Sequence, residues 1–166
     1  MDALNVVTLS QAKLWLRVDP DFTEDDAIIS ALIKAAVNQI EQYTLQILYQ
    51  RVISAKTDMD GFYRIYEYPL VSIEDLTNDD AESVLFTEQT QQWFTDIISD
   101  DNGLQTLTFV AGYGWDYEGG TECPDDIQVA IKELLTYLYE NRANPKAEWP
   151  VTITYLLSPY RRVSLF

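Results

Sequence analysis

The strongest constraint on the fold is a long run of apolar residues that recur every three or four positions. It extends from Ile29 to Ile47 and would span about six helical turns. This spacing lines one face of an α-helix, and the three acids at 24–26 favour the positive end of its dipole. We expect one long helix that packs its apolar face into the core, rather than against a partner helix.

After Leu48 the apolar pattern changes to alternation, which is typical of β-strands. The segments at 49–57 and 62–68 indicate a hairpin, with a turn at the sequence DMDG (58–61). Further strands are expected at 70–76 and 104–112, and another turn at DDNG (100–103). The stretch 82–98 is ambiguous and favours strands joined by turns. The middle of the chain should therefore be largely sheet.

Helical patterns flank this middle on both sides. Thr8 and Gln11 have the spacing of a capping box ahead of a short first helix. Pro124 fits the first turn of a C-terminal helix that continues to the YENR sequence at 139–142. We predict an α+β fold, with a helical core made of the short N-terminal helix, the long second helix and the C-terminal helix, and a strand-rich acidic middle. Its 166 residues suit one domain, 1–166, with 145–166 as a possible interaction tail.

Charge is concentrated in one segment. The chain has a formal net charge of −16, and the stretch from Glu67 to Asp126 holds 15 acids and neither Lys nor Arg. Tight binding to nucleic acid is disfavoured because it depends on basic contacts with phosphate. An acidic face can repel DNA, imitate DNA or attract a basic protein, and plain solubility is an equal alternative. The acids that we expect to project from turns are Asp79, Asp80, Asp100 and Asp101.

The residue types argue against an enzyme. There is no histidine and a single cysteine, Cys123, so neither a Ser-His or Cys-His pair nor an ordinary zinc site can form. The stretch GYGWDYEGGT (112–121) resembles a P-loop, but Gly120 replaces the lysine and three nearby acids would repel phosphate. The calcium-loop reading of DMDG places Lys56 at the first ligand position. We expect no cofactor, no metal, no signal peptide and no membrane span.

Several short motifs, in order along the chain, resemble the head–tail connector (adaptor) proteins of tailed bacteriophages and prophages. They are LSQAKLWLRVD, IEQYT, PLVSI, FVAGYG, CPDDIQVAI, LYENR and YLLSPYRR. The resemblance implies a ring beneath the portal through which DNA passes without tight binding. It also implies a helical family core, to which the strand-rich middle would be an elaboration.

The resemblance assigns roles to particular residues. Its structural motif comprises Gly112, Tyr113 and Gly114 at a strand-end turn, Pro124 at a helix start, and Tyr139, Asn141 and Arg142 near the helix end. The tail would contact a neighbouring subunit or the portal through Leu156, Leu157, Tyr160, Arg161 and Arg162, unless it docks on its own core.

We therefore expect a non-enzymatic structural protein of the phage head–tail junction. Its partners would be further copies of itself in a ring, the portal protein and a tail-side completion protein, with no membrane. It would be made in the cytoplasm of the bacterial host and reside in the virion. The alternative is an acidic DNA mimic or regulatory protein that binds a basic partner and works as a monomer or dimer.

Overall fold

The computed structural model of the protein describes residues 2–92, 94–114, 121–142 and 148–162. The chain forms two compact units, one from residues 1–49 together with 122–166 and the other from residues 50–121. The first unit is helical and the second is an antiparallel sheet, which confirms the α+β class.

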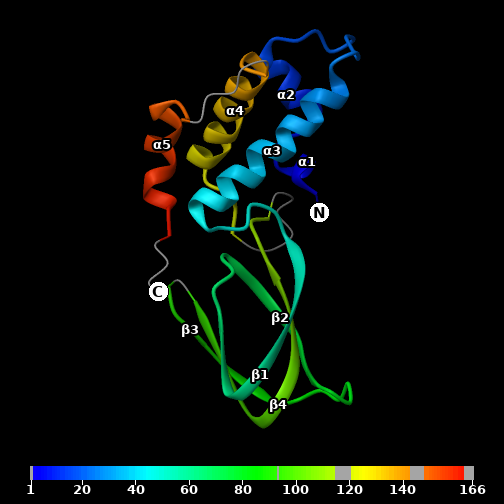
Figure 1. The fold of residues 1–166 in the computed structure, drawn as a ribbon, viewed down its shortest axis with the longest axis vertical. Coiled ribbons are helices and arrows are strands. Elements are labelled where there is room, and N and C mark those ends of the chain that lie inside the picture. Colours follow the sequence, from blue (N-terminus) through cyan, green and yellow to red (C-terminus); the bar gives the residue numbers. More distant parts are fainter. Residues whose placement is uncertain (1, 93, 115–120, 143–147, 163–166) are drawn as a thin grey trace. The chain divides into compact units, whose positions relative to one another are not determined.

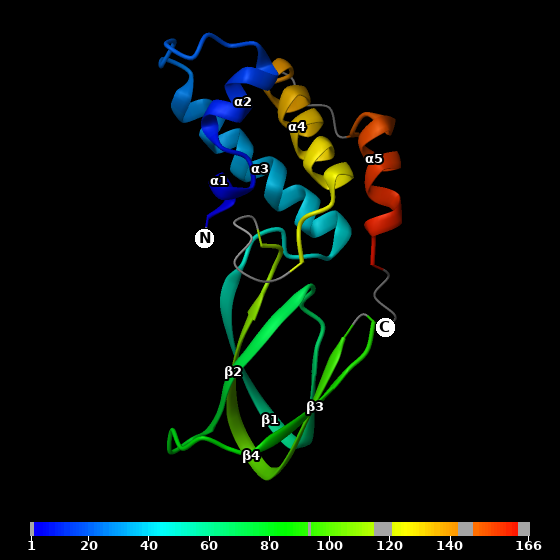
Figure 2. The same cartoon turned by 180° about the vertical axis from the view of Figure 1, so that it is seen from behind.

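Five helices make up the described part of the helical unit: α1 (Ala3–Val6), α2 (Leu9–Leu16), α3 (Asp26–Thr44), α4 (Asp125–Glu140) and α5 (Val151–Leu157). A short 3-10 turn (Ser158–Tyr160) follows α5. Helices α3 and α4 lie side by side, α5 packs on α4, and α1 and α2 pack on α3 (Figures 1 and 2).

The apolar periodicity explains why α3 and α4 pair. Both helices bury a stripe of side chains that are fully removed from solvent, namely Ile29, Ile33, Val37 and Ile40 of α3 with Ile127, Ile131, Leu134 and Leu135 of α4. Burying side chains of this size stabilises by about 1.5–3 kcal/mol each. The long helix stops three residues before the end of the predicted run, because Leu45 adopts the left-handed conformation with φ of 55°.

The sheet unit is organised around one long strand, β4 (Thr95–Ala111). Strand β1 (Arg51–Ile65) pairs with β4 over nearly its whole length. Strands β2 (Leu70–Asn78) and β3 (Phe86–Thr90) pair with residues 105–111 and 95–99 of β4. Alternate residues of β4, including Ile97, Leu107 and Phe109, are buried, which gives the sheet one apolar face.

Two predicted turns are wrong. The sequences DMDG and DDNG both lie inside strands, β1 and β4, and their backbones pair with each other, with Asp60 opposite Asn102. The next paired residue of β1 is Phe62, which lies opposite Ile98. Residues 99–101 of β4 therefore interrupt the regular pairing of this ladder. Turn-forming residues serve here to bend strands instead of ending them, and Gly103 takes a positive φ of 115°.

Candidate functional site

The described C-terminal segment docks on the helical unit to which it belongs. Leu157 is fully buried. The side-chain amide of Gln46 donates to the carbonyl oxygen of Tyr160 at 2.7 Å, and the backbone N–H of Arg162 donates to the carbonyl oxygen of Thr44 at 3.0 Å. These contacts fix residues 157–162 beside the C-terminal end of α3.

The five tail residues that were predicted to contact a partner differ in how far they are buried. The tail's buried member is Leu157, whereas Leu156, Tyr160 and Arg162 are half-buried and Arg161 is exposed. The Arg161 guanidinium lies 5.1 Å from the ring centre of Tyr43, and the Tyr160 hydroxyl donates to Asp126 at 3.1 Å. Their role as a partner interface stays a prediction. The outward side of α5 presents Val151 and Tyr155, both at least 80% exposed.

The motif residues near the end of α4 form a polar cluster with the start of α3. The hydroxyl of Tyr139 donates to Asp25 Oδ2 at 2.6 Å, and Arg142 Nη1 lies 3.5 Å from the same oxygen. Asn141 donates from its side chain to the carbonyl oxygen of Tyr137 at 2.8 Å. The hydrogen bond from Tyr139 to Asp25 raises the pKa of Tyr139 above its ordinary value. The cluster ties α4 to the N-terminal end of its antiparallel neighbour.

The strand-end turn shows what its first glycine contributes. Gly112 has a φ of 121°, a conformation that favours glycine, and its N–H donates to the carbonyl oxygen of Pro69 at 2.8 Å. Tyr113 is buried, and Gly114 donates to the carbonyl oxygen of Thr121 at 3.1 Å. The turn is thus held by backbone geometry. The rest of the near P-loop, residues 115–120, lies outside the described residues.

The helix start at Pro124 differs by one position from the prediction. Pro124 is the N-cap of α4, and its carbonyl oxygen accepts from the N–H groups of Ile127 and Gln128. Asp125 and Asp126 follow in the first turn, where carboxylates favour the positive end of the helix dipole.

Strand pairing brings the two predicted acidic pairs to one stretch of the sheet. Asp79 and Asp80 are exposed and lie in the turn after β2, as expected. Asp100 and Asp101 are also exposed, but they lie in the irregular part of β4 rather than in a turn. Strand β2 ends opposite residue 105 and β3 begins opposite residue 99, so the 79–85 connection spans residues 100–104. Whether these acids face DNA stays a prediction.

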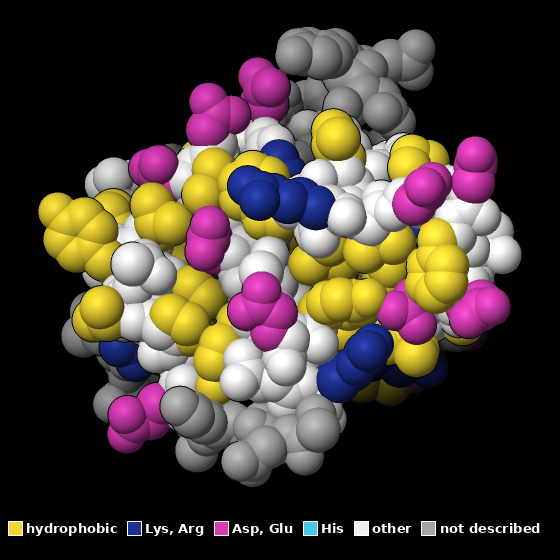
Figure 3. Space-filling view, turned by 90° about the horizontal axis from the view of Figure 1, so that it is seen from above, with side chains coloured by type: hydrophobic (Ala, Val, Ile, Leu, Met, Phe, Trp, Pro, Cys, Tyr) yellow, Lys and Arg dark blue, Asp and Glu magenta, His cyan; other side chains and the backbone are white. Residues whose placement is uncertain are grey.

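Acidic side chains on one further face are spread out. Figure 3 shows one face of the molecule on which acids stand apart, with apolar and basic side chains between them. In the sheet unit, Asp96 receives two hydrogen bonds from Arg64, at 2.6 and 2.9 Å. That contact lowers the pKa of Asp96.

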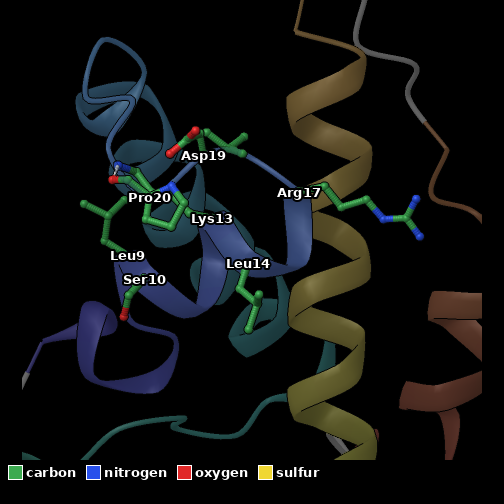
Figure 4. Close-up of a pocket in the computed structure, with 8 residues that line it drawn as sticks. Leu9, Ser10, Lys13, Leu14, Arg17, Asp19 and Pro20 are labelled. Atoms are coloured by element: carbon green, nitrogen blue, oxygen red, sulfur yellow. Dashed lines mark hydrogen bonds between the residues drawn. The ribbon is translucent and has the colours of Figure 1, made fainter.

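A pocket beside α2 contains a buried lysine whose contacts are structural. Lys13 Nζ donates to the carbonyl oxygens of Pro20 and Phe22, at 3.1 and 2.9 Å, and forms an ion pair with Asp26. Figure 4 shows Lys13 turned toward the Pro20 loop, while Arg17 extends the other way across α4. Three oxygens match the three donors of an ammonium group, so Lys13 fastens the 17–25 connection to α2 and α3.

The described residues offer few groups for chemistry. No set of three or more Cys, Asp or Glu residues among them is arranged to hold a metal ion. Burial is the main cause that raises the pKa of the Cys123 thiol well above its usual range, with further contributions from Asp125 and Glu122. A neutral buried thiol is a poor nucleophile. No helix in the described ranges is both long and apolar enough to cross a membrane.

Sequence comparison identifies a known family. The family described as phage gp6-like head–tail connector protein matches residues 6–162. No curated protein matches the sequence significantly.

Three solved structures share the fold. One chain from the neck of an empty GTA particle, computed with C6 symmetry, has a TM-score of 0.77 and 17% identity, covering 97% of this chain and 92% of that one. A chain of the native gene transfer agent (GTA) virion has a TM-score of 0.75 and 18% identity, covering 100% and 94%. A third, from the native GTA neck computed with C12 symmetry, has a TM-score of 0.71 and 18% identity, covering 96% and 93%.

The matches extend over both units. Coverage of 96–100% includes the sheet unit, so these three structures share the strand-rich middle with this chain.

Proposed function

Because the chain belongs to the phage gp6-like head–tail connector family, we propose that it is a non-enzymatic structural protein of the head–tail junction of a phage-like particle. The observation that carries this proposal is the family match over residues 6–162, which takes in both units. Residues 1–166 would act together as one connector domain in the virion, after synthesis in the bacterial host cytoplasm.

The proposed assembly is a ring beneath the portal. Neck structures of GTA particles computed with C6 and C12 symmetry contain chains of this fold, which supports a cyclic arrangement. A closed ring requires each subunit to use two different faces, one for each neighbour. The other partners would be the portal protein on the head side and a completion protein on the tail side.

DNA would pass through the ring without tight binding. The 15 acids between Glu67 and Asp126, with no base among them, support this role because a negative lumen repels phosphate. Asp79, Asp80, Asp100 and Asp101 are the proposed channel-facing acids. Their common stretch of sheet would present them as one group.

The C-terminal tail is the proposed contact to a neighbouring subunit or the portal. Leu157 would hold α5 on its own unit, while Arg161 and the half-buried Leu156, Tyr160 and Arg162 would supply the contact. The exposed pair Val151 and Tyr155 would extend that surface.

Electron microscopy of the purified protein mixed with its cognate portal tests the proposal. We expect rings stacked coaxially on the portal. A protein that stays monomeric or dimeric in the mixture, and that competes with DNA for a basic partner, would instead be a DNA mimic.

A further inference from the structure

A small pocket between α2 and α4 combines apolar and basic side chains. Its lining is Gln11, Leu14, Trp15, Arg17 and Lys132, so two of five residues are cations and none is an acid. Leu14 is 79% exposed and Trp15 is 42% exposed. The Lys132 ammonium lies 5.7 Å from the ring centre of Trp15. The pocket therefore combines apolar side chains with two positive charges.

These two cations differ from four others in the chain. Lys13, Lys34, Arg64 and Arg142 each form an ion pair with an acid of the same chain. Within the described ranges, neither Arg17 nor Lys132 has such an ion pair. In a chain with 27 acids and 11 bases, two adjacent cations without an acid suit a carboxylate from outside.

The β2–β3 connection has the complementary character. Leu85 is 93% exposed, the highest value among the large apolar side chains that the structure describes, and exposed Glu82 and Glu88 lie three residues to either side. The connection is braced, because Asn78 Oδ1 accepts from the N–H groups of Asp80 and Glu82 at 3.1 and 2.9 Å. A braced loop loses little conformational entropy on docking.

We propose that Leu85 of one copy inserts into the α2–α4 pocket of the next copy, which makes this contact a subunit junction of the ring. This inference rests on the proposed function and deepens it. Leu85 would pack on Leu14 and Trp15, while Glu82 and Glu88 would pair with Arg17 and Lys132. The contact joins two different surfaces, as cyclic closure demands. Asp79 and Asp80 lie earlier in the connection and take no part.

Cross-linking of two mixed variants, each with one added cysteine, tests this pairing. Gln11→Cys places a thiol in the pocket and Ser83→Cys places one on the loop, while native Cys123 is buried. The two variants are mixed, assembled on the portal and treated with a short bismaleimide. The mixture should give several-fold more cross-linked dimer than either variant gives alone. Three results would overturn the proposal. They are equal yields of dimer from the mixture and from either variant alone, a cross-link from Gln11→Cys to the portal, and a cross-link within one chain of the double variant.

Charge and anchor variants give an independent readout. Leu85→Asp should abolish the mixed cross-link, whereas Val52→Asp, at another exposed apolar site of the sheet unit, should leave it unchanged. Arg17→Glu with Lys132→Glu should also abolish it, and adding Glu82→Lys with Glu88→Lys should restore it. Rings formed normally by Leu85→Asp would overturn this inference but leave the connector function standing. Failure of the unaltered chain to form any ring would count against the connector function. The same cross-linking experiment in concentrated solution would then test whether Leu85 of one copy contacts the α2–α4 pocket of another.

Discussion

Tyr139 and Asp25, 114 residues apart in the sequence, are joined by a hydrogen bond of 2.6 Å between the tyrosine hydroxyl and a carboxylate oxygen. This contact connects the last turn of α4 with the residue that precedes α3. It explains why residues of the LYENR motif matter to the fold: they secure one end of the central helix pair.

Tyr139→Phe should destabilise the protein by about 1 kcal/mol, because a hydrogen bond to a carboxylate is lost while Arg142 still pairs with Asp25. Urea denaturation measures the change. The matched control is Tyr155→Phe, at a residue that is 81% exposed, and we expect it to change stability by less than about 0.5 kcal/mol. Equal effects would contradict a specific role for Tyr139.

Alkaline pH should reduce the advantage of the natural protein over Tyr139→Phe. The pKa of Tyr139 is raised from 10.0 in the folded protein, first by its hydrogen bond to Asp25 and then by burial. A raised folded pKa stabilises fully below the unfolded pKa, and that stabilisation is lost as pH rises through the folded pKa. The stability difference between the two proteins should therefore be constant up to about pH 9 and shrink above pH 10. A difference that stayed constant to pH 11 would contradict the assignment.

Replacing the buried lysine beside α2 should have a larger effect. Lys13→Met removes an ion pair and two hydrogen bonds to backbone carbonyls, so we expect a loss of about 2–3 kcal/mol. Lys34→Met removes only the pair with Asp2, in which both side chains are more than half exposed, and should cost below about 1 kcal/mol. Thermal and chemical denaturation of both variants decide this. A Lys13→Met protein as stable as the control would show that its contacts contribute little.

Helices α2, α3 and α4 could be anticipated from the sequence because their signals are local, whereas α1 and α5 were not predicted. The predicted capping box between Thr8 and Gln11 is confirmed. It could be predicted because it involves only residues that are close together in the sequence. The apolar stripes of α3 and α4 were likewise visible as periodicity. Periodicity alone does not mark the end of α3 at Thr44, because the apolar spacing continues past the left-handed residue Leu45.

The errors arise where distant segments decide the structure. DMDG and DDNG carry strong turn signals, but each lies opposite the other in the β1–β4 ladder, and this pairing outweighs local turn preference. The hydrogen bond between Tyr139 and Asp25 and the pocket formed by α2 with Lys132 have no local signature either. Only the folded arrangement brings those residues together.

The acidic stretch of the sheet should govern how DNA moves through the particle. Changing Asp79 with Asp80, or Asp100 with Asp101, to lysine should alter stability by no more than about 0.5 kcal/mol per site, since all four are exposed. New contacts with phosphate should nevertheless slow DNA ejection, most strongly at low salt. Ejection kinetics of particles carrying each variant, at low and high salt, provide the measurement. Normal ejection that is independent of salt in every variant would favour solubility as the role of these acids.

We propose that this chain forms the ring between head and tail. Cryo-electron microscopy of the neck of the native particle, with a small tag on this chain as a marker, tests it most directly. We predict ring-shaped density directly beneath the portal, into which the helical and sheet units fit, with the marker repeated around the axis and DNA in the central channel. Particles whose neck lacks the marker, or marker density elsewhere in the virion, would contradict the account.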